Sequence, residues 1–343
     1  MAKIKVAVLF GGASNEHDIS LVSAANVIES IPKDKYEVTC IGITKKGRWL
    51  YYPGDTKDIK SGEWERNPDC ASAIISPDPI HKGIITIENG DATVRKIDVV
   101  FPVIHGKNGE DGSLQGLLDM AKLPYVGCGL LASASCMDKA HTHMILDYNN
   151  IKTAKWRMIT QRDINHLEEQ YEKIAEDLRF PMFIKPANCG SSIGINKAND
   201  FEELDAAVKT AFSHDNKVII EEFIKGRELE VAVFGYDSPF ASFAGEIKAC
   251  NDFYDYDAKY VLEDSQLCIP AELENEKMLE IREIALKAYK CLGCKGLSRV
   301  DFFLTENGEF YLNEINTMPG FTSISMYPKL MQHLGMSQSY LVD

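Results

Sequence analysis

Short apolar runs alternate with amphipathic segments along this chain, and each run indicates a buried strand or the covered face of a helix. Strands are predicted at residues 3–10, 36–43, 98–104, 123–129, 180–186, 218–224, 226–234, 241–249, 298–304 and 310–316. Helices are predicted at residues 18–31, 113–121, 133–149, 201–212, 274–292 and 323–334. Residues 45–96 are rich in Gly, Pro and charge, and we interpret them as surface loops and short strands. The opening strand, turn and helix predict an open α/β sheet, which binds ligands at the carboxyl ends of its strands.

The most informative pattern is an apolar hairpin near the end of the chain, with its turn at residues 306–309. Strand alternation puts Arg299 and Asp301 on one face of the first strand. Glu314 and Asn316, two positions apart, share a face of the second strand. Asp301, Glu314 and Asn316 can therefore gather as three oxygen ligands beside one arginine. Mg²⁺ prefers such ligands and keeps substrate phosphates in its remaining positions, so a Mg²⁺ site is predicted, with a solvated strand edge as the alternative.

Composition narrows the class of protein. The 343 residues suffice for two or three domains, and the 45% hydrophobic and 26% charged residues are ordinary for a soluble globular protein. A net charge of −14 argues against nucleic acid or an anionic membrane as the main partner, although a phosphate can still be held locally. We expect no signal peptide and no membrane span. Nine cysteines scattered through apolar segments are typical of reduced thiols, which predicts a cytoplasmic protein.

Two glycine-rich loops follow predicted parallel strands. Gly11-Gly12 ends the first strand and leads to Glu16 and His17, but it lacks the spacing of a dinucleotide fingerprint. The second loop, residues 105–112, starts with His105 and carries three glycines and two acidic residues. Polar side chains on a glycine scaffold favour a ligand loop, with a capped surface turn as the alternative.

A lysine-bearing strand and the loop after it suit a phosphate. Lys185 leads into a loop in which glycines bracket Ser191 and Ser192. Backbone N–H groups and hydroxyls can cradle phosphate oxygens while the lysine offsets their charge, although the order of a Walker loop is absent. Lys139, in a predicted helix, is by itself as compatible with plain surface as with a phosphate contact. His141 and His143, farther along that helix, face different sides of it, which argues against a metal pair.

The strands after this loop suit an adenosine. An apolar strand ending in acidic and aliphatic residues can offer its backbone to an adenine edge, and Glu228 is placed for ribose hydroxyls. A strand edge with solvated acids is the alternative. Residues 251–260 form a polar aromatic loop of the kind that often serves as a lid. Cys291 and Cys294 have the spacing of a metal knuckle, but no second pair follows, so buried structural thiols are favoured.

Taken together, these motifs resemble the D-alanine–D-alanine ligase family, which has the ATP-grasp fold. The resemblance runs in order through nearly the whole chain and rests on Gly11–Ser20, His105–Gly112, Lys185-Pro186, Gly190–Ser192, Tyr254–Tyr260, Arg299–Asp301 and Asn313–Gly320. It implies an α/β fold with an N-terminal Rossmann-like parallel-sheet domain, a small central lid domain and a C-terminal α+β domain. We place these at residues 1–125, 126–216 and 217–343.

The resemblance also implies ligands for matching positions. The metal ligands, for two Mg²⁺ (or Mn²⁺) that bridge the ATP phosphates, are Asp301, Glu314 and Asn316. The residues implied in ATP binding are Lys139, Lys185, Ser192, Glu221, Glu222, Phe223, Ile224 and Glu228.

The amino-acid substrates are implied to lie between the remaining motifs. Glu16 takes the ammonium of the first D-alanine, with His105 near its carboxylate, and Ser191 and Tyr260 form a hydrogen-bonded network with Glu16. The second D-alanine's carboxylate is received by Lys259, Ser325 and the backbone at Met326. Arg299 and the Gly320 N–H form the oxyanion hole.

The implied reaction is ATP-dependent ligation of two D-alanine molecules for peptidoglycan precursor synthesis, and a homodimer is expected by resemblance alone. A carboxylate is a poor acyl donor, so ATP phosphorylates it first, and the second amine then attacks the acyl phosphate. Positioning and charge neutralisation suffice for such phosphoryl transfer, and a closing lid must exclude water.

Two other classes remain open at this point. One is a related ligase that makes D-alanine–D-lactate or D-alanine–D-serine, although Tyr260 is present and Met326 offers an apolar wall suited to a methyl group. The other is a non-enzymatic nucleotide-binding module, which we would expect to lack metal ligands or Arg299.

Overall fold

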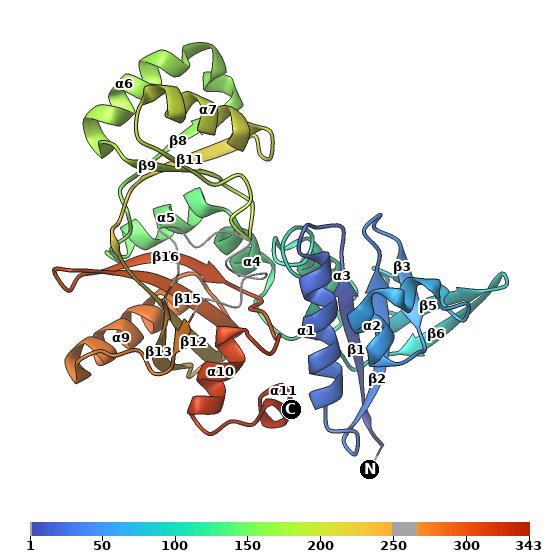
Figure 1. The fold of residues 1–343 in the computed structure, drawn as a ribbon. Helices are drawn as coiled ribbons and strands as arrows, with labels where there is room; N and C mark the ends of the chain where they lie inside the picture. Colours follow the sequence, from blue (N-terminus) through green and yellow to red (C-terminus); the bar gives the residue numbers. More distant parts are fainter. Residues whose placement is uncertain (1, 249–265) are drawn as a thin grey trace.

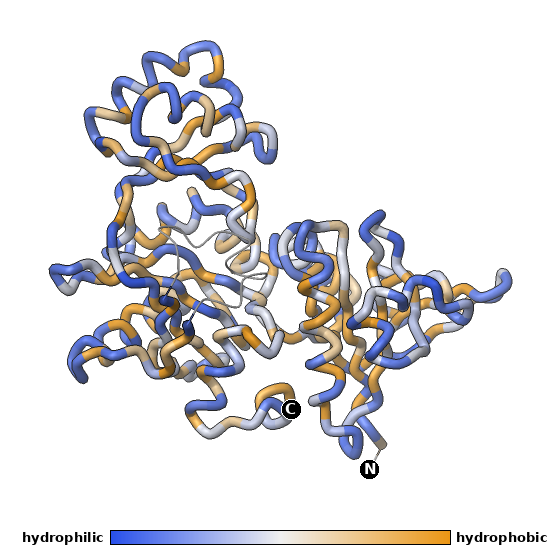
Figure 2. Tube along the Cα trace, in the orientation of Figure 1, coloured by the Kyte–Doolittle hydropathy of each residue, from blue (hydrophilic) through white to orange (hydrophobic). Residues whose placement is uncertain are grey.

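The computed structural model describes residues 2–248 and 266–343, and three sheets organise this part of the chain (Figure 1). Figure 2 shows hydrophobic stretches along the strands and hydrophilic ones on the outer loops and outer helix faces. None of the helices that the structure describes is long and apolar enough to cross a membrane.

The first sheet has the order β6-β5-β4-β3-β2-β1-β7. Its strands are β1 (Ile4–Gly11), β2 (Tyr36–Ile43), β3 (Trp49–Tyr52), β4 (Ala71–Ile75), β5 (Gly83–Glu88), β6 (Asp91–Lys96) and β7 (Val99–Val103). Only β2, β1 and β7 are parallel, and helix α1 (His17–Ser30) packs on them. The loops that follow β1 and β7 therefore lie side by side at one edge of the sheet.

The interpretation of residues 45–96 as surface was wrong in part. The predicted short strands are present, but they extend the sheet on the antiparallel side of β2. Between them, α2 (Thr56–Ser61) and the 3₁₀ helix η1 (Glu63–Arg66) bury Ile59 and Trp64 completely, and the Trp64 ring packs edge-on against Phe10 at 5.0 Å. Ile59 and Trp64 stand alone among polar residues, so the sequence shows no periodic pattern that would have predicted their burial.

The second sheet is β10-β9-β11-β8, and helices α6 (Leu167–Leu178) and α7 (Phe201–Phe212) share its core. Its strands are β8 (Trp156–Thr160), β9 (Met182–Pro186), β10 (Asn196–Ala198) and β11 (Lys217–Glu222). The 3₁₀ helix η2 (Gln161–His166) leads into α6. Strand β11 pairs with both β8 and β9, so the pairing of this sheet runs past residue 216. The three-domain division itself stays a prediction.

The third sheet is β14-β13-β12-β15-β16. Its strands are β12 (Gly226–Gly235), β13 (Phe240–Lys248), β14 (Gln266–Cys268), β15 (Gly296–Thr305) and β16 (Phe310–Asn316). Helix α9 (Asn275–Cys291) covers the face that carries Leu229 and Val231. Strand alternation turns Glu230 and Ala232 to the opposite face, against which α10 (Met326–His333) packs.

Two predicted elements are corrected. The helix predicted at residues 133–149 is broken into α4 (Leu130–Met137) and α5 (Lys139–Tyr148), because Asp138 is extended and accepts hydrogen bonds from the Ala140 and His141 N–H groups as the cap of α5. Residues 123–129 form no strand of their own, only a bridge between Tyr125 and Val100. The other predicted strands and helices are confirmed, with ends within three residues.

A shared core joins the first and third sheets. Phe10 and Phe101 from the first sheet pack in one cluster with Phe321, from the segment after β16, and Tyr327, from the helix α10 that packs on the third sheet. Two short helices lie near this shared core. Helix α3 (Ser113–Met120) follows the loop after β7, and α11 (Gln338–Val342) contacts α1. The loops after β1 and β7 thus face the segment that follows β16.

Candidate active site

The β15–β16 hairpin brings three of the predicted ligands together. Asp301 lies directly opposite Glu314, and Arg299 lies opposite Asn316. A bulge after Asp301 sets this register, and it leaves Asn313 as the extra residue of β16. Glu314 therefore shares the site face with Asp301.

Arg299 is held between two carboxylates. Its Nε donates to Asp301 Oδ1 at 2.8 Å and its Nη2 donates to Asp301 Oδ2 at 2.7 Å. Glu230 Oε2 lies 3.0 Å from the same Nε, as an ion pair from the neighbouring strand. Burial opposes the charged form, but the charges of Asp301 and Glu230 outweigh it and raise the pKa of Arg299 well above its usual range. The guanidinium is a fixed cation in this site.

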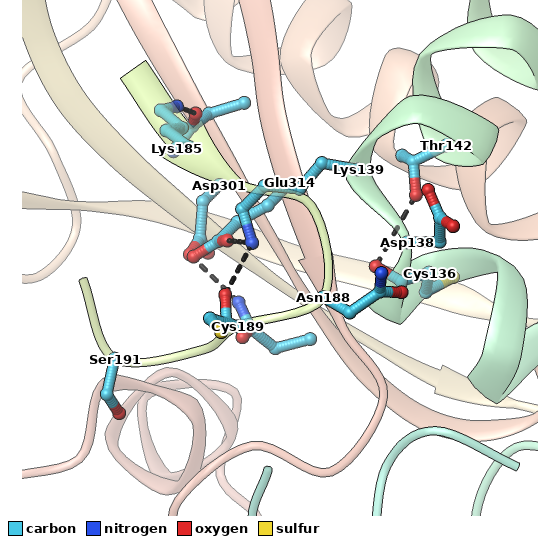
Figure 3. Close-up of polar contacts among 12 residues, drawn as sticks. Cys136, Asp138, Lys139, Thr142, Lys185, Asn188, Cys189, Ser191, Asp301 and Glu314 are labelled. Atoms are coloured by element: carbon cyan, nitrogen blue, oxygen red, sulfur yellow. Dashed lines mark hydrogen bonds and ion pairs between the residues drawn. The ribbon is translucent and has the colours of Figure 1, made fainter. Parts of the chain in front are cut away.

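The donor set on the hairpin fits a hard divalent cation. Asp301 and Glu314 offer carboxylate oxygens and Asn316 an amide oxygen, although Asn316 Nδ2 here donates to Asp301 Oδ2 at 3.0 Å. Glu314 Oε2 lies 3.8 Å from Lys139 Nζ, and Figure 3 shows Lys139, Asp301 and Glu314 directed toward one another. Within the described ranges no group of three His, Cys, Asp or Glu side chains forms a metal cluster. A metal here would need the asparagine oxygen and ligands from a substrate.

The loop after β9 passes beside this cluster. Lys139 Nζ donates to the Cys189 carbonyl at 2.8 Å, which ties the start of α5 to the loop (Figure 3). Ser191 and Ser192 have φ angles of 51° and 58°, which turn successive N–H groups toward one side. Such a turn can receive an anion, as the sequence predicted for Ser192.

Lys185 belongs to a second, closed cluster. Its Nζ lies 2.6 Å from Glu221 Oε2 and donates to Asn313 Oδ1 at 3.3 Å. Glu221 Oε1 accepts from His143 Nε2 at 2.9 Å, and Trp156 stacks on the histidine at 5.2 Å. Burial opposes ionisation of Glu221, but Lys185 and then His143 hold its pKa well below the usual range. Both carboxylate oxygens are engaged, so a direct contact of Glu221 with adenosine requires one partner to yield.

The other residues predicted to hold adenosine lie where the chain crosses between the second and third sheets. Glu222 exchanges hydrogen bonds with the Lys155 backbone at 2.8 and 2.9 Å. Phe223 packs on Phe183 with ring centroids 5.7 Å apart. Ile224 follows in the crossover, and Glu228 lies on β12 opposite Phe303. The adenosine role of these four residues stays a prediction.

Glu16, in the loop after β1, contacts the loop after β9. The Ser191 hydroxyl donates to Glu16 Oε1 across the gap between the first and second sheets. A side chain at Gly106 would lie 2.2 Å from Glu16 Oε2, and one at Gly190 would lie 3.1 Å from it. Glycine at both positions is what lets this carboxylate reach the site.

His105 and Glu110 hold the backbone of Met318, in the segment that follows β16, at its carbonyl and its N–H. His105 Nδ1 donates to the Met318 carbonyl at 3.0 Å, so its Nε2 accepts from Ser23 Oγ at 3.1 Å. Burial lowers the pKa of His105, in keeping with this neutral tautomer. Glu110 accepts from the Gly106 and Met318 N–H groups at 2.7 and 3.0 Å. Both ring nitrogens of His105 are engaged, so its predicted place near a substrate carboxylate stays untested.

The clamped segment leads to Gly320 and α10. A side chain at Gly320 would lie 2.8 Å from Ser325 Oγ, so the backbone passes close to that hydroxyl. Ser325 Oγ accepts from the Thr322 N–H at 3.0 Å, and Met326 begins α10 with its side chain buried. Ser325, the N-cap of α10, makes no side-chain hydrogen bond to the first turn, so the N–H groups of Met326 and Tyr327 can bind a carboxylate.

A cavity of about 120 Å³ lies where the three sheets meet. Its lining includes predicted site residues from all three sheets: Glu16, His105, Lys139, Ser191, Arg299, Glu314, Asn316, Gly320, Ser325 and Met326. Lys185, Ser192 and Asp301 lie beside this space rather than on its wall. Lys259 and Tyr260 fall outside the described residues.

Two family models match the chain: that of the D-ala D-ala ligase N-terminus at residues 5–128 and that of the D-ala D-ala ligase C-terminus at residues 145–343. The chain belongs to the D-alanine–D-alanine ligase family. A relative from Thermoanaerobacter sp. (strain X514), named D-alanine–D-alanine ligase, is 50% identical over 100% of this chain and 95% of its own. One from Ruminiclostridium cellulolyticum, of the same name, is 47% identical over 100% and 94%.

Solved structures of this family share the fold. The VanG D-Ala:D-Ser ligase from Enterococcus faecalis has a TM-score of 0.92 and 41% identity, over 100% of this chain and 98% of that one. The D-alanine–D-alanine ligase from Coxiella burnetii has a TM-score of 0.85 and 33% identity, over 99% and 93%. The ATP-grasp fold predicted from the motifs is therefore confirmed.

Sequence reasoning missed three polar residues of this ligase-family site: Glu230, Glu110 and His143. Glu230 alternates with apolar residues, so a charge at a core position of a central strand was the available signal. Glu110 was noted only as part of a polar loop. For His143 the sequence argued correctly against a pair with exposed His141, but its partner Glu221 lies 78 residues away.

Proposed function

We propose that this protein joins two D-alanine molecules into D-alanyl-D-alanine with ATP, for peptidoglycan precursor synthesis. The observation that carries the proposal is the cavity where Glu16, Lys139, Arg299 and Gly320 meet, in a chain whose full-length relatives bear the ligase name. Each of these groups comes from a different segment, and each suits one step of an acyl-phosphate reaction.

The phosphates of ATP would be bound by cationic side chains and by metal ions. Lys139 and Lys185 would bind ATP phosphates, with the Ser192 N–H turned toward them. Two Mg²⁺ (or Mn²⁺), held by Asp301, Glu314 and Asn316, would neutralise the charge that develops on the transferred phosphoryl group. The cluster carries a net negative charge that such cations would offset, because three acids surround two bases. The acids are Glu230, Asp301 and Glu314, and the bases are Arg299 and Lys139.

The amino-acid end would be handled by fixed hydrogen-bond donors and acceptors. Glu16, oriented by Ser191, would accept the ammonium group of the first D-alanine. Arg299 and the Gly320 N–H would stabilise the oxyanion of the tetrahedral intermediate. His105 would act by holding the Met318 peptide, which leads to Gly320. Ser325 and the Met326 N–H, with Lys259, would receive the carboxylate of the second substrate.

Three features of the wider proposal rest on resemblance and composition. We propose the division into residues 1–125, 126–216 and 217–343 as the working domains, with the central one moving as a lid. A cytoplasmic location fits cysteines that form no disulfide among the described residues. A homodimer is the expected assembly.

A second candidate differs only in the acceptor. The VanG structure is titled a D-Ala:D-Ser ligase, and it matches this chain with a TM-score of 0.92. A D-serine acceptor would need a free hydroxyl partner near Met326. Ile247, Leu267 and Ile324 line the cavity on this side, and the hydroxyls of Thr322 and Ser325 are hydrogen-bonded to each other at 2.7 Å. We therefore favour D-alanine as the second substrate.

The test measures ATP-dependent phosphate release with D-alanine alone and with D-alanine plus D-serine or D-lactate. Product mass identifies the bond that is formed. D-alanine alone should support turnover and yield the dipeptide, and added D-serine should yield only a minor mixed product. A dominant D-alanyl-D-serine product would establish the second candidate. No release with any of these acceptors would overturn the proposed function.

A further inference from the structure

Glu230 is a buried acid that none of the roles above uses. It lies on β12 directly opposite Asp301 of β15, and its side chain is 9% exposed. It also borders the cavity. A carboxylate in the middle of a central strand is costly unless a cation compensates it, and Arg299 Nε, 3.0 Å from its Oε2, is that cation.

The other anchor of Arg299 has a competing task. Both oxygens of Asp301 accept from Arg299, yet Asp301 is also a proposed metal ligand. If Asp301 binds a divalent cation, its carboxylate attracts the Arg299 guanidinium less strongly, because the cation offsets part of its negative charge. Glu230 is outside the proposed ligand set, so its attraction for Arg299 persists whatever Asp301 binds.

We infer that Glu230 is a positioning residue, which fixes the Arg299 guanidinium in the orientation needed at the oxyanion. Asp301 and Glu230 engage Nε and Nη2, and among the described residues neither of them engages Nη1. The remaining N–H groups can therefore face the cavity that Arg299 borders. This inference rests on the proposed function, because it assigns Glu230 a part in the same ligation.

The same sheet supplies a matched control. Arg227 of β12 and Glu246 of β13 form a cross-strand pair, with Nε and Nη2 donating to the two carboxylate oxygens at 2.8 and 2.7 Å. Glu246 is about as buried as Glu230, with side-chain exposures of 7% and 9%. Glu246 does not border the cavity. Neutralising it removes a comparable pair that has no part in the chemistry.

The experiment compares Glu230→Gln with Glu246→Gln in the full chain with Mg²⁺ and ATP. Glu230→Gln should lower kcat by roughly 10- to 100-fold, the usual loss for a supporting partner of a functional group. The KM for ATP should stay within about twofold, because the nucleotide contacts lie on other residues. Calorimetry with a phosphinate dipeptide, whose tetrahedral phosphorus mimics the intermediate, should show a loss of affinity by the same factor. Glu246→Gln should leave kcat and this affinity unchanged.

A double-mutant comparison separates positioning from general damage. If Glu230 acts through Arg299, Glu230→Gln should lower kcat no further in an Arg299→Ala background. Should Arg299→Ala unfold because it leaves two buried acids unpaired, Arg299→Lys takes its place. Equal kcat losses for Glu230→Gln with and without Arg299, or equal losses for Glu230→Gln and Glu246→Gln, would overturn the inference. So would wild-type kinetics in Glu230→Gln. Absence of dipeptide synthesis in the unmodified protein would instead overturn the proposed function.

Discussion

Two clusters of buried charge lie close together in this protein, and they differ in balance. On β15–β16, Arg299 is surrounded by Glu230, Asp301 and Glu314, so acids are in excess. Near the loop after β9, Lys185 and Glu221 pair at 2.6 Å, and His143 and Asn313 complete the set. Lys185 joins the two clusters through its bond to Asn313 of β16.

This difference in charge balance suggests that the first cluster binds a ligand, whereas the second mainly stabilises the fold. A closed pair satisfies its own charges and can stay buried without a ligand. An excess of carboxylates in an enclosed place favours a bound cation, and for this reason we propose the hairpin cluster as the metal site. Substitutions in the first cluster should therefore change chemistry, and those in the second should change folding first.

The largest effect is expected from Glu314→Gln. Losing one metal-binding charge should reduce ligation below detection at limiting Mg²⁺ while the fold is kept, because the cluster still holds Asp301 and Glu230 around Arg299. Phosphate release across a Mg²⁺ titration and thermal unfolding are measured together. Turnover at the parental rate at limiting Mg²⁺ would remove the hairpin from the metal site.

Glu221→Gln should act on stability first. It leaves the buried Lys185 ammonium without its counter-charge, which costs about 3–5 kcal/mol of unfolding free energy. ATP should restore part of this loss by supplying phosphate charge to Lys185. Urea unfolding with and without ATP measures both effects. The exposed pair of Glu63 and Arg66 gives the control, since Glu63→Gln should cost less than about 1 kcal/mol. Equal losses at both sites would remove the distinction between the clusters.

Arg299→Ala should lower kcat by about 10²- to 10³-fold, as expected when an oxyanion donor is lost. ATP binding should survive, because the predicted nucleotide contacts lie on α5 and on β9 to β12. Steady-state kinetics and nucleotide titration are compared in the same variant. A variant that fails mainly by losing ATP would assign this arginine to the nucleotide instead.

The smallest effect concerns Glu110, which adds a further acid near the hairpin cluster. Burial, and then the charge of Glu16, raise its pKa from 4.5 to about 8, against backbone hydrogen bonds and Arg299 that lower it. The folded state therefore holds a proton that the unfolded chain has released, so stability should fall as pH rises from about 4.5 to about 8. Glu110→Gln should flatten this slope, as urea unfolding from about pH 5 to about pH 9 would reveal. An unchanged slope would place the proton on a neighbour such as His105.

Local patterns predicted most of the elements and the main ligands of the site. Alternation and a short turn were enough to gather Arg299, Asp301 and Glu314, because residues of one hairpin find each other through local geometry. The bulge that pairs Glu314 with Asp301 was not predictable, because no Gly marks it and alternation alone does not say which residue of β16 lies opposite Asp301.

Contacts between distant segments set the limit of sequence reasoning. The partner of Glu230 is Arg299, 69 residues away, and that of Glu110 is Met318, 208 residues away. No periodic pattern in the sequence indicates contacts at such distances. The break before α5 was missed for a different reason. Asp138 can be either a helix residue or a cap, and its ion-pair partner Lys217 lies on β11 of the second sheet, far along the chain. Neither β8 nor α6 was predicted. β8 buries only Ile159 and shows little apolar pattern, whereas α6 buries Tyr171, Ile174 and Leu178 at helical spacing, which is a signal that could have been used.

The clamp on Met318 has a consequence for how the chain is made. His105 leaves the ribosome 213 residues before the carbonyl that accepts its hydrogen bond. At about 5–20 residues per second, that interval is roughly 10 to 40 s. During it the first sheet can fold, while the loop of residues 105–112 keeps its polar groups in water. The nascent protein therefore carries one half of the proposed active site for most of its synthesis, and the site can be completed only after translation has passed the last strand.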